Sequence, residues 1–373
     1  MSATSIVPPP LADQWRSHAT YCAATGAPLY ATLMRGLADD LEAGGPVARL
    51  VVGRDGARVP DVLQLRILGG LHRLVLDGDA PELAEWYRTA GGDRDPEIAW
   101  PAARDAIEEH LDRLRVGLDH VPQTNEAGRS AALAAGLTAA AVRSGLGRIR
   151  LLELGSSAGL NLRVDRFRIT GAGWSWGPED SPVQLIDAVR EGSSPHQALP
   201  GAGDVPGASG LAGLTGLAGA PIPQIVERRG CDLSPLDATD VQAQLRLLSY
   251  VWPDHVERFH RLRAALSVAA RWPVVIDRAP LGAWIDRQLA APAPEGVLTV
   301  VWHSIVMQYV SAAEKAQVAH AVAAAADRMP VVHLALEAPI APYTTTPELR
   351  LDGTLLATVA AHGVPVAWRS EPA

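Results

Sequence analysis

Lysine, cysteine and long apolar runs are all scarce in this chain of 373 residues. Lys315 is the only lysine, so a mechanism that passes through a lysine Schiff base is not expected. Two cysteines, Cys22 and Cys231, provide neither a disulfide framework nor a cysteine zinc site, and we predict no metal site. No apolar run approaches the roughly 20 residues of a membrane helix, and residues 1–10 lack the basic and apolar regions of a secretory signal. We therefore expect a cytoplasmic protein without a membrane partner.

The balance of charge is acidic, with a formal net charge of −8. An acidic chain lacks the basic surface that attracts nucleic acid, so no nucleic-acid partner is expected. Hydrophobic residues make up 48% and charged residues 20% of the chain, which is typical of a globular protein. The length allows two domains or one large domain with insertions. The oligomeric state does not follow from these features.

The rest of the sequence is organised around residues 148–162. Residues 148–154, Arg-Ile-Arg-Leu-Leu-Glu-Leu, contain an apolar run that ends in the acidic Glu153, which is typical of a buried strand. Gly155 and Gly159 follow, and glycine permits the sharp turns and the close ligand approach that a binding loop needs. The residues after this loop can continue as a helix whose N-terminal amides face a ligand. We therefore predict a strand, a loop and a helix that together hold a cofactor.

Three kinds of site contain a loop of this kind. A dinucleotide site has the pattern G-x-G-x-x-G, whose middle glycine lets the pyrophosphate approach the backbone, but Ser157 stands at that position here. A nucleophile elbow has the pattern G-x-S-x-G, which Gly155 to Gly159 match with Ser157 at the centre. Residues 153–159 also closely resemble the E-x-G-x-x-x-G loop of class I S-adenosylmethionine-dependent methyltransferases.

The surrounding segments predict an α/β fold in two parts. Residues 1–145 have mainly helical periodicity, clearest over 61–76, and form a predicted helical N-terminal cap region. In residues 146–373 apolar runs alternate with helical segments, which indicates a Rossmann-like, doubly wound, mostly parallel sheet. An insertion at about 166–224 follows the first strand and its loop. It contains a predicted β-hairpin and then, over 191–220, a segment rich in glycine, alanine, proline and serine that we interpret as a mobile loop or lid.

Further strands are predicted after the insertion, and they locate the expected site. They cover residues 225–231, 273–276, 297–302 and 331–337, with a helix over 354–361 and a last, edge strand over 365–369. In open sheets of this type ligands bind outside the carboxyl ends of the strands, near the topological switch point.

Polar residues stand at these carboxyl ends. Asp232 ends the second strand, where a carboxylate can accept hydrogen bonds from both ribose hydroxyls of an adenosyl ligand or, alternatively, cap the next helix. Asp277 ends the third strand, where Asp-Arg-Ala-Pro is also good turn chemistry. His303 ends the fourth strand, as a catalytic base or as a histidine hydrogen-bonded to a neighbour. Glu337 ends the fifth.

A polar run also precedes the first strand. Asn125 can cap the helix predicted over 131–142, and Arg129 stands close to the start of that helix. The alternative interpretation is that this polar segment lies over the cofactor loop, as the corresponding segment often does in class I methyltransferases.

Several segments occur together, in this order, in one bacterial family. They are Leu68-Gly-Gly-Leu-His-Arg-Leu-Val-Leu76, Pro81-Glu-Leu-Ala84, Gln123-Thr-Asn-Glu126 with Arg129, Leu152-Glu-Leu-Gly-Ser-Ser-Ala-Gly-Leu-Asn-Leu162, Gly230-Cys-Asp-Leu-Ser-Pro-Leu-Asp-Ala-Thr-Asp240 and Val251-Trp-Pro253. Over nearly its whole length the chain resembles bacterial domain-of-unknown-function family 2332. The resemblance implies a methyltransferase-like Rossmann domain behind a helical N-terminal region, and it implies no established reaction.

Similarity to class I methyltransferases at large implies roles for individual residues. The loop from Glu153 to Gly159 would lie under the methionine part of S-adenosylmethionine, Asp232 would hold the ribose, and Asp277 would lie near the adenine. His303 would face the methyl acceptor as the catalytic residue. The full set of predicted cofactor-binding residues is Asn125, Arg129, Glu153, Gly155, Ser156, Ser157, Gly159, Asn161, Asp232, Leu233 and Asp277. The fourth strand ends in His-Ser and not in an acidic or Asn-Pro-Pro-Tyr-like signature, which leaves the acceptor class open and disfavours a nucleic-acid base.

We therefore predict a methyltransferase that uses S-adenosylmethionine and acts on a small molecule. One alternative is an α/β-hydrolase-like serine esterase with Ser157 as nucleophile, Asp277 as acid and one of His303, His333 and His362 as base. Its weakness is that a nucleophile elbow normally follows several strands, whereas the residues before this loop have helical periodicity. A second alternative is a protein that binds an adenosyl ligand without catalysing a reaction.

Overall fold

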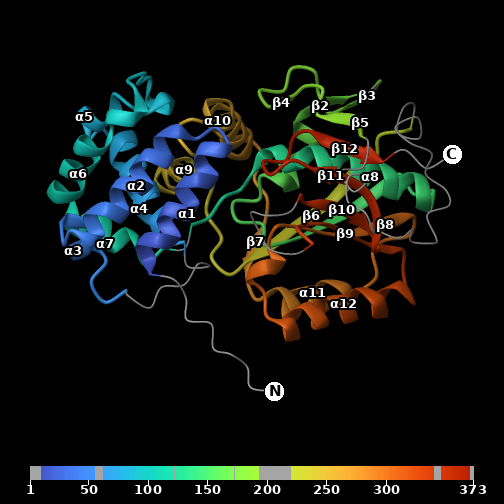
Figure 1. Cartoon of the computed structure of the whole chain (residues 1–373). Helices are drawn as coiled ribbons and strands as arrows, with labels where there is room; N and C mark the ends of the chain where they lie inside the picture. Colours follow the sequence, from blue (N-terminus) through green and yellow to red (C-terminus); the bar gives the residue numbers. More distant parts are fainter. Residues whose placement is uncertain are drawn as a thin grey trace, which may run out of the picture. The chain divides into compact units, whose positions relative to one another are not determined.

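The chain folds into two compact units, which we describe one at a time from a computed structural model (Figure 1). The structure describes residues 10–54, 62–120, 122–171, 173–192, 220–339 and 346–369. One unit combines Met1–Thr124 with Asp240–Arg263, and the other combines Asn125–Thr239 with Ala264–Ala373. The sequence led us to expect a division near residue 145. In the structure the division falls earlier, at Thr124, and the helix that directly precedes the first strand belongs to the second unit.

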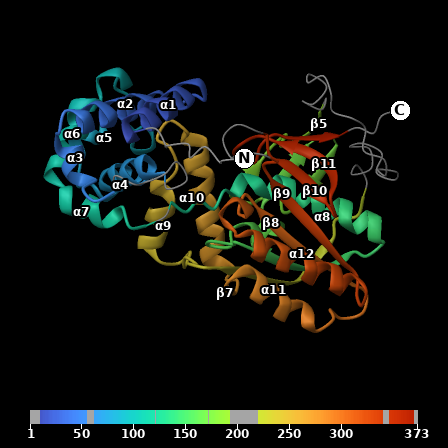
Figure 2. The same cartoon turned by 60° about the horizontal axis from the view of Figure 1, so that its bottom comes forward.

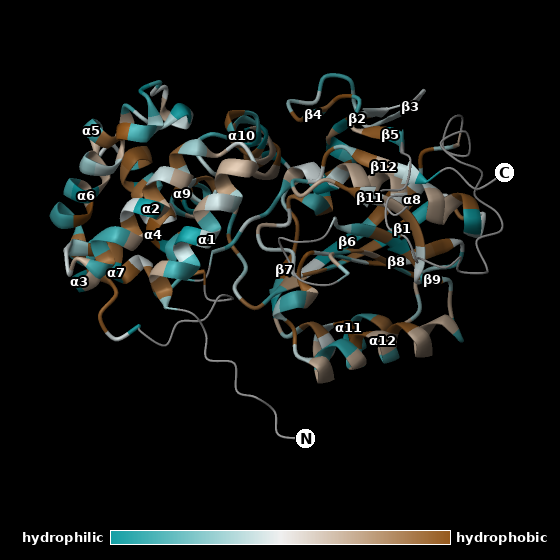
Figure 3. Cartoon of the chain, viewed as in Figure 1, coloured by the Kyte–Doolittle hydropathy of each residue, from teal (hydrophilic) through white to brown (hydrophobic). Residues whose placement is uncertain are grey.

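The first unit is helical. Its helices are α1 (Leu11–Ala24), α2 (Pro28–Glu42), α3 (Pro46–Leu50), α4 (Leu63–Asp77), α5 (Pro81–Ala84), α6 (Trp100–Glu109), α7 (Leu111–Gly117), α9 (Val241–Ser249) and the first half of α10 (Val256–Arg271), with short 3-10 turns at Arg88–Ala90 and Pro96–Ile98. Apolar side chains from α1 to α7 form one core, and Figure 3 shows the apolar stretches on α2 and α4 that contribute to it. The helix predicted over 61–76 is confirmed as α4, since Ile67, Leu71 and Leu74 repeat at helical spacing and are all buried.

His72 is a structural histidine of this core. Its ring is fully buried, with Nε2 at 2.8 Å from Thr89 Oγ1 and Nδ1 at 3.2 Å from the carbonyl oxygen of Ser249. Burial lowers the pKa of His72 to about 4, so the neutral ring is the form that is packed there.

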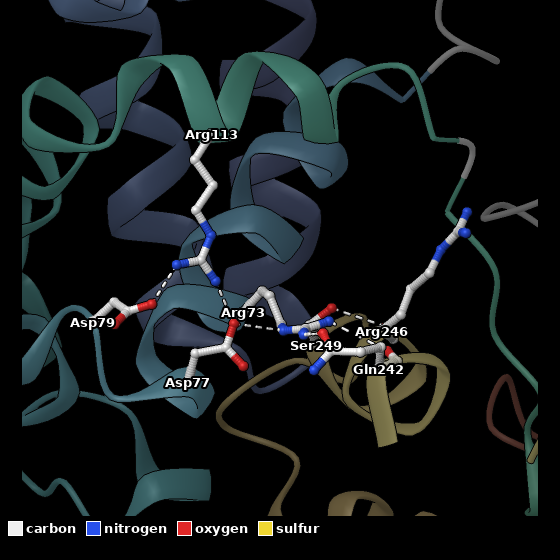
Figure 4. A network of polar contacts seen from close by, with 7 residues as sticks. All are labelled: Arg73, Asp77, Asp79, Arg113, Gln242, Arg246 and Ser249. Atoms are coloured by element: carbon white, nitrogen blue, oxygen red, sulfur yellow. Dashed lines mark hydrogen bonds and ion pairs between the residues drawn. The ribbon is translucent and has the colours of Figure 1, made fainter. Parts of the chain in front are cut away.

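Within the first unit, a polar network joins α9 to α4, and α4 to α7 (Figure 4). Asp77, at the end of α4, accepts a 2.8 Å bond from Arg73 Nε and also pairs with Arg113 of α7. Arg113 reaches Asp79 as well, and Arg73 donates to the carbonyl oxygen of Gln242 at 3.3 Å. The segment that returns to this unit after the sheet has begun is therefore held by charged side chains as well as by apolar packing.

In the second unit, nine strands of the described residues form one sheet. Its order is β5-β12-β11-β10-β9-β8-β1-β6-β7. The strands are β1 (Arg148–Leu154), β5 (Val189–Gly192), β6 (Gln224–Asp232), β7 (Ile276–Arg278), β8 (Val297–Ser304), β9 (Val331–Glu337), β10 (Glu348–Leu351), β11 (Thr354–Val359) and β12 (Val366–Arg369). The block β7-β6-β1-β8-β9 is parallel throughout, whereas β10 and β11 run antiparallel to their neighbours. The prediction of an α/β protein with a mostly parallel sheet is confirmed.

The chain changes direction across this sheet between β1 and β8. From β1 it moves outward on one side through β6 to β7, and it then returns to the other side of β1 to form β8 and β9. Helices α11 (Leu281–Ala290) and α12 (Ala312–Ala326) lie side by side along one face (Figures 1 and 2), where Trp284 and Val318 pack against Leu152 and Val301. Helix α8 (Ser130–Ser144) lies on the other face. The carboxyl ends of β1 and β8 thus meet at the topological switch point.

Three local predictions are corrected. Residues 354–361 do not form a helix, because Thr354–Val359 is strand β11. A short apolar run is compatible with either a helix or a strand, and the β-branched residues of this run favour the strand. Strand β12 is confirmed at the end of the chain, but it is not an edge strand, because β5 pairs with its other side. The loop after β1 leads into a 3-10 segment, Asn161–Arg166, and not into an α-helix.

Arg163 gives a physical reason for that last correction. Its backbone is non-helical, with φ −104° and ψ 21°. Its Nη1 donates back to the carbonyl oxygens of Ala158 and Gly159 at 3.1 and 2.7 Å, which satisfies loop carbonyls that a continuing helix would have to bond.

The insertion contributes a small second sheet. The predicted hairpin is confirmed as β2 (Arg168–Gly171) and β3 (Trp174–Trp176), with β4 (Gln184–Leu185) alongside β2. Most of the loop predicted over 191–220 lies outside the described residues. Across the parts of the chain that the structure describes, we find no helix with the length and apolar character needed to span a bilayer.

Candidate functional site

The loop after β1 is built from left-handed backbone. Gly155, Ser157 and Gly159 have φ values of 72°, 53° and 66°. A Cβ added to Gly155 would lie 2.5 Å from Val306 Cγ2, and one added to Gly159 would lie 2.9 Å from Ile276 Cδ1. Both glycines are therefore required by backbone conformation and by close neighbours within the protein. Ser157 adopts the same conformation without being glycine, which is a local strain.

Strand β6 holds this loop from one side. The amides of Gly155 and Ser156 both donate to the carbonyl oxygen of Cys231 at 2.9 Å. At the end of the same strand, Asp232 accepts a 2.9 Å bond from the Ser157 amide at Oδ2 and a 2.8 Å bond from the Ser234 amide at Oδ1. Asp232 thus joins the loops that follow β1 and β6.

Two asparagines support the loop from the other side. Asn125 Oδ1 accepts from the Leu160 amide at 2.9 Å, and Asn161 Oδ1 accepts from Ser130 Oγ at 2.8 Å. Both side chains are buried. The structure therefore joins Asn125 to the residue that directly follows the predicted cofactor loop, and it joins Asn161 to the start of α8. Ser156 is buried in the same way, with its hydroxyl donating to the carbonyl oxygen of Glu153 at 2.9 Å.

Glu153 is a buried carboxyl group directly under the loop. Burial raises the pKa of Glu153 to about 8, although the neighbouring Asn161 and Trp302 side chains oppose the shift. Among the described residues, Oε2 of Glu153 and Nε1 of Trp302 have no partner with hydrogen-bonding geometry, so we attribute to Trp302 an electrostatic influence only. The hydroxyl of Ser157 is a third buried group for which the described chain supplies no partner. Buried polar groups of this kind are uncommon and occur at functional sites.

The neighbouring strand β8 ends in a second strained loop. Ile305 has φ 50°, which is rare for a β-branched residue. Its amide donates to the carbonyl oxygen of Leu336 at 2.9 Å. The carbonyl oxygen of the preceding Ser304 accepts a 3.2 Å bond from Nη1 of Arg129, which belongs to the 3-10 turn Ala127–Arg129 before α8. The structure therefore brings Arg129, predicted as a cofactor residue, to the end of β8.

His303 lies inside the sheet, with both ring nitrogens engaged. Its Nδ1 is 2.7 Å from Glu337 Oε1, and its Nε2 is 2.9 Å from His333 Nε2. The residue is only 2% exposed. Burial and the adjacent His303 lower the pKa of His333 to about 4, so a neutral His333 shares the hydrogen bond. This environment resembles that of a positioning residue more than that of a base in contact with a substrate.

Asp277 and Leu233 lie at the β6–β7 side of the sheet. The Asp277 carboxylate accepts from Arg229 Nε and Nη2 at 2.7 and 2.9 Å and from Trp284 Nε1 at 2.7 Å. The Arg229 guanidinium lowers the pKa of Asp277. Leu233 follows Asp232 and is 67% exposed, while its carbonyl oxygen accepts from Arg278. Asp277 is therefore committed to an ion pair, and Leu233 offers an apolar surface beside Asp232.

The serine-esterase alternative gains no geometric support. The Ser157 hydroxyl has no partner among the described residues, and His303 and His333 bond each other. Asp277 bonds Arg229 and Trp284. None of the hydrogen bonds that we observe joins Ser157, Asp277 and a histidine into a triad.

Two features of the site were missed by sequence reasoning. One is the contact between Val306 and Gly155, and the other is the three-residue line of Glu337, His303 and His333. The sequence carried one signal for the second feature, because His303 and Glu337 each end a predicted strand.

The fold and this edge define the class of protein: an α/β protein with a candidate ligand site where two strained loops meet at a topological switch point. The chain belongs to the bacterial family described as "Uncharacterized protein conserved in bacteria (DUF2332)", which matches residues 12–368. No curated protein and no solved structure matches the chain.

Proposed function

We propose that the second unit binds S-adenosylmethionine and transfers its methyl group to a small molecule. The observation that carries the proposal is the bond between the Ser157 amide and Asp232, which joins the glycine-bounded loop at the switch point to the carboxylate at the end of the neighbouring β6. A carboxylate at the end of the second strand can accept hydrogen bonds from the two ribose hydroxyls of an adenosyl group, and the exposed Leu233 suits its flat base. The order β7-β6-β1-β8-β9 supports a Rossmann-like assignment, since it repeats the 3-2-1-4-5 order of that fold.

The local backbone favours an adenosyl ligand over a dinucleotide. A pyrophosphate binds at the N-terminus of an α-helix, where free amides and the helix dipole attract negative charge. Here the loop leads into the short, kinked segment Asn161–Arg166, and the amide of Ser157 is already bonded to a carboxylate. An acidic partner at this place disfavours phosphate, and it is compatible with a sulfonium cation.

The chemistry then requires positioning more than acid–base catalysis. S-adenosylmethionine supplies an activated methyl group whose bond to sulfur breaks as the bond to the acceptor forms, while the acceptor releases a proton. The residues of this chain would hold the donor and align the acceptor, and alignment alone can provide much of the rate enhancement. Asp232 and the loop from Gly155 to Gly159 would hold the donor at the ends of β1 and β6, and Arg129 and Ser304 would border the acceptor side at the end of β8.

Release of S-adenosylhomocysteine tests this proposal. The wild-type protein would be incubated with S-adenosylmethionine and fractionated bacterial small molecules, and the product would be quantified by mass spectrometry. Product that depends on one fraction and is lost in Gly155→Val supports the transferase. Binding without turnover in any fraction would support the non-catalytic alternative, and covalent labelling of Ser157 by a fluorophosphonate would support the esterase.

A further inference from the structure

One oxygen atom of Glu337 collects three donors at the end of β8. Oε1 lies 2.7 Å from His303 Nδ1, 3.1 Å from the Val306 amide and 3.3 Å from the Met307 amide. Glu337 comes from the end of β9, whereas its donors come from β8 and the loop that follows it. A carboxylate is the only common side chain that accepts several bonds without donating any, so this arrangement uses its negative charge.

The loop after β8, which Glu337 holds, has a backbone conformation that its own sequence disfavours. Ile305 has the positive φ that a β-branched residue avoids, and it stands between the two segments that Glu337 bonds, His303 before it and Val306 after it. Strained backbone persists where the surroundings over-determine it. Here the surroundings are Glu337, the Leu336 carbonyl oxygen and the guanidinium of Arg129.

The same loop bears directly on the cofactor loop. Val306 occupies the space in which a side chain at position 155 would stand, at 2.5 Å from an ideal Cβ there. A displacement of Val306 would therefore alter the packing that lets Gly155 keep its left-handed conformation. In this way Glu337, which accepts from the Val306 amide, is linked to the β1 loop through the Val306 side chain.

His303 completes the arrangement from the interior. Glu337 engages one ring nitrogen and His333 engages the other, so the ring has no nitrogen left for a substrate within the described structure. With Nδ1 as the donor to Glu337, His303 serves as a buried spacer that orients the carboxylate toward the loop amides.

We propose that Glu337 is a positioning residue that holds the loop after β8, and through Val306 the loop after β1, in the binding-competent form. The effect on a ligand rests on the proposed function, whereas the effect on the loop does not. Two measurements therefore separate them: hydrogen exchange of the amides of Val306, Met307 and Gly155 in the ligand-free protein, and the affinity for S-adenosylhomocysteine.

Two variants and one control carry the test. Glu337→Ala removes the acceptor, and Glu337→Gln keeps a neutral acceptor. The control, Glu227→Gln, removes a carboxylate from an ion pair with Arg150 on β1, at the opposite end of the strands. We expect Glu337→Ala to speed exchange at Val306 and Met307 by about tenfold or more and to weaken S-adenosylhomocysteine binding by about tenfold, since charge-assisted bonds are lost. Glu337→Gln should recover most of the protection, and the control should match the wild type.

A double-mutant cycle with Val306→Ala tests the route of the effect. If Glu337 acts through the Val306 side chain, Glu337→Ala should cost less than about threefold in affinity once that side chain is shortened. Equal losses in both backgrounds, or unchanged exchange in Glu337→Ala, would overturn the proposal. Failure of the wild type to bind S-adenosylhomocysteine would instead remove the proposed function, and the exchange data would then decide the role of Glu337 alone.

Discussion

The main-chain amide of Ser157 donates a 2.9 Å hydrogen bond to Oδ2 of Asp232. These residues are far apart in the sequence, and the parallel pairing of β1 with β6 brings them together. The bond shows that Asp232 organises the loop after β1 as well as its own turn, in which it also bonds the Ser234 amide. Removal of the Asp232 carboxylate is therefore expected to lower the stability of the fold and to weaken ligand binding.

The first prediction concerns Asp232. Asp232→Ala should weaken adenosyl binding about tenfold to a hundredfold, because charge-assisted hydrogen bonds of roughly 1.5–3 kcal/mol to the ligand are lost. Its melting temperature should also fall, because two loop amides lose their acceptor. Asp237→Ala is the matched control, since the hydrogen bonds of Asp237 within the described part of the chain go to the nearby Thr239 in the same loop region. The affinity of both variants for S-adenosylhomocysteine would be measured by calorimetric titration. Equal affinities would show that Asp232 is a structural cap only.

The second prediction separates steric packing from backbone strain at Gly155. Gly155→Ala and Gly145→Ala both place a side chain on left-handed backbone, at a cost of about 1–2 kcal/mol. Only at position 155 does the new Cβ meet a neighbour, because an added Cβ at Gly145 has nothing within 4 Å. Urea denaturation should therefore show a larger loss for Gly155→Ala, and Val306→Ala should restore part of it. Equal losses at the two glycines, with no rescue, would mean that the Val306 contact is unimportant.

The third prediction concerns Ser157. The Ser157 amide remains in Ser157→Ala, and its hydroxyl has no partner in the described chain. Adenosyl affinity should therefore fall by at most one neutral hydrogen bond, about 1 kcal/mol. The wild type should neither hydrolyse a nitrophenyl ester nor react with a fluorophosphonate. Labelling of Ser157 that disappears in the alanine variant would favour the esterase.

Part of the fold and part of the candidate site could be predicted from the sequence alone. The strand β1, the glycines that turn after it and the strand-end residue Asp232 could be predicted, because apolar runs, glycine chemistry and strand order are local or topological signals. The contact of Val306 with Gly155 and the line from Glu337 to His333 could not, because they depend on strand register and side-chain direction. The strand β11 was missed because a short apolar run is ambiguous.

The fourth prediction is a pH dependence of stability. The pKa of Glu153 is about 8 in the folded protein and near 4.5 in the unfolded chain, so between these values the folded state holds one more proton. Its contribution to stability is therefore complete below about pH 4.5 and is lost as the pH rises toward 8, at no more than about 1.4 kcal/mol per pH unit. Glu153→Gln should remove this fall in the free energy of unfolding, so the variant should become more stable relative to the wild type as the pH rises. Parallel curves from urea denaturation at pH 5 to 9 would show that Glu153 titrates normally.

The most direct test of the central claim is calorimetric titration of the wild-type protein with S-adenosylhomocysteine, S-adenosylmethionine and NAD. We predict saturable binding of both adenosyl ligands at one site per chain, and no binding of NAD, because the segment after the β1 loop lacks the α-helix that a pyrophosphate requires. Binding of NAD in preference to the adenosyl ligands, or binding of none of the three, would contradict the account.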